Sequence, residues 1–177
     1  MNPDKNVSLV VMGVAGCGKS SLGAALAERM GWALIEGDDH HSPGSREKMA
    51  KGTPLTDADR AGWLATLAGL LAQRQGGVVL TCSSLRRAYR EQLRAADPAL
   101  RFVFLDITPE QALARVAARS SHFFSSSLVD SQFATLESPV GEPGVLRADA
   151  TAPLPQLVAD VSAWLQAASN PQTPEAA

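Results

Sequence analysis

The sequence lacks the features that mark small secreted proteins and membrane proteins. It has only two cysteines, Cys17 and Cys82, which lie far apart and show neither a CxxC pair nor the Cys/His spacing of a zinc site. The longest mainly apolar run near its start, residues 7–12, is far shorter than the ~20 residues that cross a bilayer. We therefore expect reduced thiols in a soluble, cytoplasmic protein with no membrane partner.

The sequence also lacks an excess of basic residues. Its 16 lysines and arginines are balanced by 18 aspartates and glutamates, which gives a formal net charge of -2. Proteins that coat nucleic acid normally present a strongly basic face, so nucleic acid is not an expected partner. Any anionic ligand must instead be bound by a few local groups.

Length and composition predict one globular domain. With 177 residues, 45% of them hydrophobic, the chain can bury a core without disulfides or a structural metal. We expect this domain to span residues 1–168. Residues 169–177 contain proline and lack large apolar side chains, which predicts a disordered tail.

Short apolar runs alternate with longer segments of helical period, which is typical of an α/β fold. The runs read as continuous apolar stretches, as buried parallel strands do. We therefore expect a three-layer α/β/α arrangement with a five-stranded parallel sheet. The predicted strands are 7–12, 33–36, 78–81, 101–105 and, more weakly, 145–148.

Two of the expected helices carry clear start signals. Thr56 and Asp59 form a potential capping box, and Thr108, Pro109 and Gln111 combine an N-cap hydroxyl with a proline at the first helical position. Segments 38–55 and 120–127 have no clear period and are expected to be loops over a site. Helices are predicted at 19–30, 61–74, 85–96, 109–119, 128–136 and 154–168.

A phosphate-binding loop is the strongest motif in the sequence. Residues 13–20 fit GxxxxGK[ST] between a predicted strand and a predicted helix, which is the context that the motif requires. Its backbone N–H groups can converge on phosphate oxygens, Lys19 can reach the β and γ phosphates, and Ser20 can ligate Mg²⁺. The candidate nucleotide-binding residues are Gly13, Val14, Ala15, Gly16, Cys17, Gly18, Lys19, Ser20 and Ser21.

This motif leaves the phosphoryl acceptor open, because switches, motors and small kinases share it. The chain has no NKxD-type guanine-reading motif of a switch GTPase, and its length favours a small-molecule kinase. The second strand ends in acidic and imidazole groups at the edge where open α/β sheets bind ligands. We assign Asp38 as the carboxylate that orients the attacking hydroxyl and accepts its proton, the alternative being a turn-forming or helix-capping aspartate.

Three segments give the chain a more specific resemblance. They are GDDHHSPGSREKMAKGTPLTDADRAGWL, TCSSLRRAYREQLR and ARSSHFFSSSLVDSQFATLESP, in this order after the phosphate-binding loop. Together they resemble the gluconokinase family from residue 7 to about residue 164. The resemblance implies a nucleoside-monophosphate-kinase fold, ATP and Mg²⁺ as cofactors, D-gluconate as the substrate phosphorylated at its 6-hydroxyl, and a homodimer.

The resemblance also implies roles for individual residues. It places the acceptor segment at about 38–75 and a helical lid at about 115–136. In the lid, Arg115 and Arg119 lie four residues apart on one helix face, so both can point at one ligand as catalytic groups. The substrate-binding residues that it implies are Asp38, His41, Lys48, Arg60, Ser83, His122 and Gln132.

The chain departs from many members of the family at Ser45, Ser120 and Ser121. Two alternatives to a gluconokinase stay open at this point. One is another small kinase with the same phosphate-binding loop, such as a shikimate kinase, although the run of glycines that follows the third strand in that family is missing here. The other is a nucleotide-dependent regulatory protein without turnover.

Overall fold

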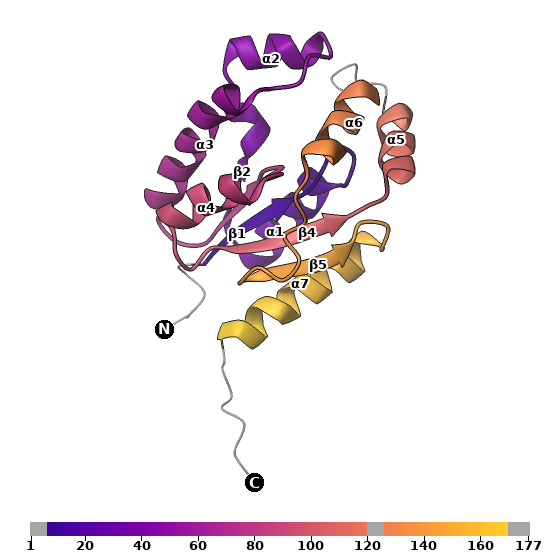
Figure 1. Ribbon diagram of the computed structural model, residues 1–177. Helices are drawn as coiled ribbons and strands as arrows, with labels where there is room; N and C mark the ends of the chain where they lie inside the picture. The colour runs from indigo at the N-terminus through magenta and orange to yellow at the C-terminus, as the bar shows by residue number, and fades with distance from the viewer. Residues whose placement is uncertain (1–6, 120–125, 170–177) are drawn as a thin grey trace.

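A five-stranded parallel sheet forms the centre of the molecule in a computed structural model, which describes residues 7–119 and 126–169 (Figure 1). The strand order is β2-β3-β1-β4-β5, and Val10 at the centre of β1 pairs with Leu80 and Phe102 on either side. The strand ranges match the predicted strands to within one residue. They are β1 (Ser8–Met12), β2 (Ala33–Glu36), β3 (Val78–Thr81), β4 (Arg101–Asp106) and β5 (Val145–Asp149).

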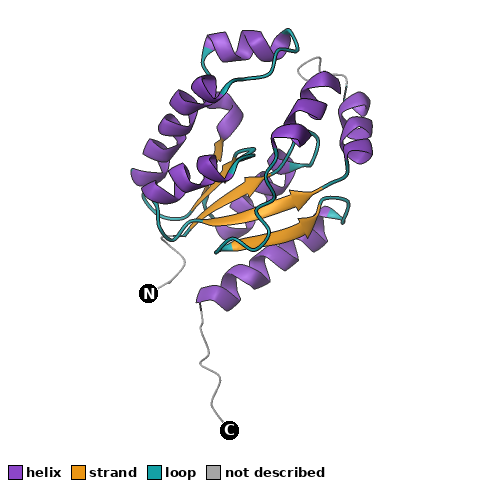
Figure 2. Cartoon of the chain, viewed as in Figure 1, coloured by secondary structure: helices purple, strands orange, loops and turns teal. Residues whose placement is uncertain are grey.

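Helices cover both faces of this sheet, which confirms the expected three-layer architecture (Figure 2). One face packs on α1 and α7, and the other packs on α3 and α4. None of the described helices combines the length and apolarity that crossing a bilayer requires. The helices are α1 (Lys19–Met30), α2 (Pro43–Ala50), α3 (Asp57–Ala72), α4 (Arg87–Ala96), α5 (Pro109–Ala118), α6 (Ser126–Thr135) and α7 (Leu154–Ser169).

Successive side chains of a strand point to opposite faces of the sheet, so these continuous apolar strands contribute to the core on both faces. In β1, Leu9 and Val11 face α1 and α7, whereas Val10 and Met12 face α3 and α4. All four side chains are fully buried. This burial of the central strand explains why its sequence is a continuous apolar run.

The segment 38–55 is not the loop that the sequence predicted. It begins with the 3₁₀ helix η2 (Gly37–His40) and continues into α2. The Ser42 hydroxyl accepts a hydrogen bond from the Ser45 N–H (3.1 Å), and Pro43 occupies the first helical position. Periodicity missed α2 because the helix is short and polar, so it has no apolar stripe to detect. Likewise, α6 begins at Ser126, inside the predicted serine-rich link.

Asp59 connects α2 to α3. Its carboxylate accepts the Thr56 N–H in the capping box of α3 (2.9 Å) and also pairs with Lys48 Nζ of α2 (2.8 Å). The bond from Lys48 and the backbone bond from Thr56 together lower the pKa of Asp59 to about 2. Because this pKa lies below the ordinary value, the stabilisation is present above pH 3.8 and is lost as pH falls through about 2.

The capping box of α3 can be tested by replacing its hydroxyl. Thr56→Ala leaves the Asp59 N–H without its side-chain acceptor, and we expect the free energy of unfolding to fall by about 1 kcal/mol. Urea unfolding at neutral pH measures this change. Thr56→Ser restores the hydroxyl and serves as the control. Equal stability of Thr56→Ala and the wild type would contradict the assignment.

Candidate active site

A cleft opens at the carboxyl edge of the sheet, where β1, β2 and β3 end side by side. It lies between the acceptor-side elements η2 to α3 and the helices α5 and α6 (Figure 1). The described residues that line it are Ala15, Gly16, Gly18, Lys19, Ser20, Asp38, His41, Met49, Pro54, Leu55, Arg60, Trp63, Ser83, Val116, Arg119, Leu128, Ser131 and Gln132.

The phosphate-binding loop connects β1 to α1 as the motif predicted. Gly16 has a φ of 82°, and a Cβ at this position would lie 2.9 Å from the carbonyl oxygen of Ala112 in α5. Glycine therefore allows the loop to turn directly beneath α5. Lys19 Nζ donates to the carbonyl oxygens of Gly13 (3.0 Å) and Val14 (3.1 Å), so the ammonium lies over the loop.

Glu36 at the end of β2 joins this loop to the sheet. Its Oε2 accepts hydrogen bonds from the hydroxyls of Ser20 (3.0 Å) and Thr81 (2.6 Å). A hydroxyl and a carboxylate are oxygen ligands of the kind that Mg²⁺ prefers. Ser20 and Glu36 therefore fit a magnesium ion and are the residues that would hold it. Among the described residues, no three His, Cys, Asp or Glu side chains form a metal site of their own.

Gly37 and Trp63 hold the start of η2. A Cβ at Gly37 would overlap the carbonyl oxygen of Thr81, so only glycine lets the chain turn out of β2 against β3. The Trp63 indole N–H donates to the Gly37 carbonyl (2.7 Å) and fixes this turn to α3. The turn places Asp38 in the cleft.

Asp38 and His41 form a pair on this platform. His41 is buried and its ring stacks on Trp63, with centroids 4.2 Å apart. Its Nε2 lies 3.4 Å from Asp38 Oδ1. The hydrogen bond from His41 lowers the pKa of Asp38, and the charges of Lys19 and Arg46 act in the same direction. Asp38 is therefore an ionised carboxylate that faces the phosphate-binding loop.

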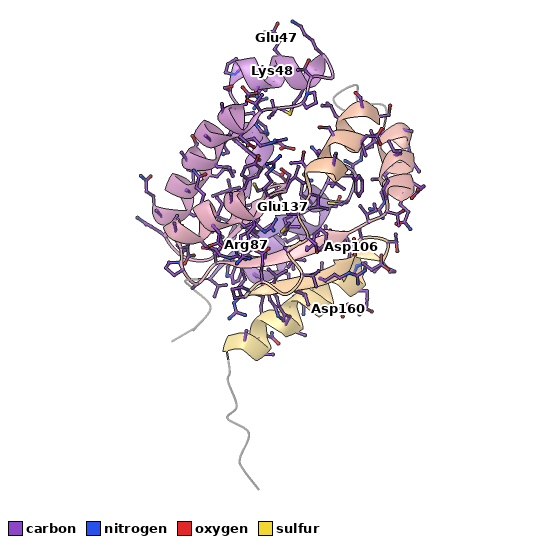
Figure 3. All side chains as sticks on the ribbon, viewed as in Figure 1. Glu47, Lys48, Arg87, Asp106, Glu137 and Asp160 are labelled. Carbon is purple, nitrogen blue, oxygen red and sulfur yellow. The ribbon has the colours of Figure 1, made fainter. Side chains whose placement is uncertain are left out.

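Arg60 and Lys48 occupy different environments, although the sequence grouped them. Arg60 is buried in α3, lines the cleft and donates to the Tyr89 hydroxyl (3.4 Å), which in turn donates to Asp57. Lys48 is paired with Asp59 and is not among the described residues that line the cleft. Figure 3 shows Lys48 on α2, at the top of the view. Arg60 is thus the acceptor-side cation that an anionic ligand in the cleft would meet.

The two lid arginines also differ, because Arg115 lies in the last turn of α5, whereas Arg119 is its C-cap in an extended conformation, one residue beyond the helix that the sequence predicted to include it. Arg115 donates to the backbone carbonyls of Gly16 and Cys17 (3.3 Å each) and of Ala150 (2.8 Å). Arg119 is exposed and lines the cleft. Both arginines border a second, adjacent cleft, which is lined by Cys17, Gly18, Ser21, Leu22, Arg115, Ala118, Arg119, Ala150, Ala152, Leu154 and Leu157.

Gln132 brings α6 to the phosphate-binding loop. Its side-chain carbonyl oxygen accepts the Ala15 N–H (2.7 Å). Ser83 also lies in the cleft, and its carbonyl oxygen accepts the Gly13 N–H (3.3 Å). His122, the remaining predicted substrate-binding residue, lies outside the described residues together with Ser120 and Ser121.

Both cysteines are buried side chains of the hydrophobic core. Burial raises the pKa of the Cys82 thiol to about 11, so the thiolate that a nucleophile needs is not populated at neutral pH. Ser45 is buried in the first turn of α2 and bonds to Ser42, and it is not among the described residues that line the cleft.

Comparison with known proteins identifies the family. A family model described as an AAA domain matches residues 9–143. A gluconokinase of Gluconobacter oxydans is 48% identical over 142 residues, which cover 78% of this chain and 80% of that protein. The crystal structure of a gluconokinase from Sinorhizobium meliloti superposes with a TM-score of 0.86 at 44% identity, covering 93% and 94% of the two chains.

This chain belongs to the gluconokinase family. The resemblance read from the three sequence segments is thereby confirmed. Shikimate kinase from Aquifex aeolicus shares the fold, with a TM-score of 0.64, but only 16% sequence identity. The chain therefore resembles shikimate kinase in its fold alone.

Sequence reasoning missed two side chains at this gluconokinase-family site. Trp63 continues the apolar stripe of α3, which predicts a core position, yet its indole also donates to the Gly37 carbonyl and stacks on His41. Glu36 ends the predicted strand 33–36 and belongs to no motif, although its carboxylate accepts the Ser20 hydroxyl. The available signal for Glu36 was its position: an acidic residue at the end of the second strand lies at the same sheet edge as the motif serine.

The influence of His41 on Asp38 can be measured directly. His41→Phe keeps an aromatic ring on Trp63 but removes the N–H that stabilises the ionised carboxylate. We expect the pKa of Asp38 to rise in this variant, as followed by NMR titration of ¹³C-labelled aspartate carboxyl groups. His40→Phe, at the exposed neighbouring position, is the matched control. An unchanged Asp38 titration in His41→Phe would refute the pairing.

Proposed function

We propose that this protein catalyses the gluconokinase reaction, transferring the γ-phosphoryl group of ATP to the 6-hydroxyl of D-gluconate to give 6-phosphogluconate and ADP. The observation that carries the proposal is the 48% identity to a gluconokinase over 78% of the chain. The cleft supports it, because a phosphate-binding loop faces both an ionised carboxylate and an arginine. These are the groups that transfer from a nucleotide to an anionic alcohol requires.

The donor side binds the phosphates of ATP. The N–H groups of Gly16, Gly18 and the first turn of α1 provide a positive electrostatic potential around the phosphates. Lys19 exchanges its carbonyl partners for phosphate oxygens. Ser20, supported by Glu36, would hold Mg²⁺, which would supply charge neutralisation at the phosphates. We place the adenine of ATP in the adjacent cleft, which Arg115 and Ala150 border.

The acceptor side orients gluconate. Asp38 accepts a hydrogen bond from the 6-hydroxyl and takes its proton as the new bond to phosphorus forms. His41 and Trp63 hold this carboxylate at the mouth of the phosphate-binding loop. Arg60 pairs with the gluconate carboxylate, for which a planar guanidinium is suited. Ser83 and Gln132 supply polar groups toward the remaining hydroxyls.

Lys48, His122 and Arg119 complete the proposed set. Lys48 reaches the substrate only if it leaves Asp59, so we expect its contribution to binding to be smaller than that of Arg60. His122 retains its proposed role on the resemblance alone. Arg119 and Arg115 offset the charge that spreads over the transferred phosphoryl group, with Arg119 the closer to the cleft. A cytoplasmic location and a homodimer are part of the same proposal.

The acceptor is tested by coupled ADP release with ATP and Mg²⁺ against gluconate, shikimate, glycerate and nucleoside monophosphates. We expect selective turnover of gluconate. Turnover of shikimate instead would support the other small-kinase reading, which at present rests on the fold alone. Absence of acceptor-dependent ADP release would favour a regulatory nucleotide-binding protein.

Asp38→Asn tests the assigned proton acceptor. The amide keeps the shape of the side chain but cannot take the proton, so we expect kcat to fall by about 10²–10⁴-fold. Asp39→Asn changes the neighbouring exposed carboxylate and should leave kcat near that of the wild type. Steady-state kinetics with gluconate measure both variants. Wild-type kcat in Asp38→Asn would overturn the assignment.

Arg119→Ala tests the transition-state role of the exposed arginine that caps the C-terminus of α5. Its loss should lower kcat more than it raises KM for gluconate, because the charge that it offsets develops during transfer. Arg119→Lys retains a positive charge and should recover part of the lost rate. An increase in KM for gluconate at unchanged kcat would place Arg119 on the substrate instead.

A further inference from the structure

The segment that follows β3, residues 82–85, has an unusual backbone. Ser84 has a φ of 49° and is the one non-glycine residue with positive φ among those that the structure describes. Such a conformation is costly and persists only where the surroundings fix it. The residue before it, Ser83, lines the cleft and accepts the Gly13 N–H through its carbonyl. The strained residue therefore lies next to a residue that contacts both the cleft and the phosphate-binding loop.

Three consecutive carbonyl oxygens of this segment are held by different parts of the chain. The Ser83 oxygen accepts the Gly13 N–H (3.3 Å) and the Leu85 oxygen accepts the Glu137 N–H (2.7 Å). Between them, the Ser84 oxygen accepts a charge-assisted bond from Arg90 Nη1 (2.8 Å). Arg90 thus holds the strained residue itself.

Arg90 is fully buried, and its guanidinium has a fixed orientation. Its Nε and Nη2 donate to the two carboxylate oxygens of Glu142 at 3.0 and 2.6 Å, which leaves Nη1 for Ser84. Arg94, one turn further along α4, also donates to Glu142 (2.9 Å), but its other hydrogen bonds go to Glu91 and to the Pro143 carbonyl rather than to Ser84. A buried ion pair often stabilises a fold no better than apolar residues would. The directed bond to Ser84 is what an apolar replacement would lose.

The same arrangement connects this segment to the chain that follows α6. Glu142 lies in the loop between α6 and β5, and Glu137 at the start of that loop accepts the Arg87 N–H at the first turn of α4 (3.1 Å). Figure 3 shows Arg87 and Glu137 side by side near the centre of the view. The loop after α6, the start of α4 and the Ser83 segment therefore form one bonded unit.

We infer that Arg90 is a positioning residue for the acceptor side of the cleft: it fixes the backbone of Ser84 and thereby the place at which Ser83 meets the substrate. It acts through Ser84 and touches no reacting atom. The inference rests on the proposed function for its kinetic readout. Within that function, Arg90 supports substrate specificity although it is not among the described residues that line the cleft.

Arg90→Lys is the test, with Arg94→Lys as its matched control. A lysine keeps the charge opposite Glu142 but lacks the fork that serves Glu142 and Ser84 together, so we expect KM for gluconate to rise about tenfold, the equivalent of one charge-assisted hydrogen bond. Both kcat and KM for ATP should change much less. Arg94→Lys perturbs the same carboxylate without the bond to Ser84, and should change KM for gluconate by less than about twofold.

The outcomes separate positioning from mere stability. A purely structural role would reduce the active fraction, lowering apparent kcat in both variants at unchanged KM, and this result would overturn the inference. If Arg90→Lys does not fold, Glu142→Gln, whose amide oxygen still accepts a bond, should raise KM for gluconate. An unchanged KM in that folded variant would likewise overturn it.

Hydrogen exchange keeps this test independent of the proposed reaction. Peptides that span residues 82–85 should exchange faster in Arg90→Lys than in Arg94→Lys or the wild type. If the wild type fails to phosphorylate gluconate, the proposed function fails, while this exchange contrast still decides whether Arg90 holds the segment. Equal exchange in all three proteins would refute the positioning role.

Discussion

The whole site depends on one constraint: parallel strands end at the same edge of a sheet. In the order β2-β3-β1, three chain segments leave that edge next to one another, although they are far apart in sequence. The first brings Asp38, the second brings Ser83 and the third brings the phosphate-binding loop. Glu36 joins them, because its carboxylate binds both the Ser20 hydroxyl and the Thr81 hydroxyl. Donor and acceptor groups are thus positioned by the sheet itself.

Charge is distributed unevenly across this site despite the net charge of -2. Among the described residues, Lys19, Arg60 and Arg119 line the cleft together with one carboxylate, Asp38 of η2, so two anionic ligands bound there meet a local positive potential. The Asp38 carboxylate remains ionised there because His41 and the nearby cations favour its charged form. The proposed proton acceptor and the phosphate-binding loop can therefore line the same cleft.

The sequence predicted the parts of this protein that are governed by local rules. The strands are continuous apolar runs, the caps of α3 and α5 are spelled out within four residues, and the phosphate-binding motif is contiguous. It could not predict α2, a short polar helix without an apolar stripe. Nor could it reveal that Lys48 binds Asp59 or that Arg115 binds backbone carbonyls, because these partners are selected by tertiary packing.

The side chains that support the site explain why local reasoning stops there. Trp63 supports η2 from α3, Gln132 reaches the phosphate-binding loop from α6, and Arg90 holds the segment after β3 from α4. Each of them binds a backbone N–H or carbonyl, a partner that every residue has and that no sequence motif marks. A reacting group can be recognised by its type, whereas a supporting group is defined only by the backbone atom that it reaches. Its function is therefore visible only once the chain has folded.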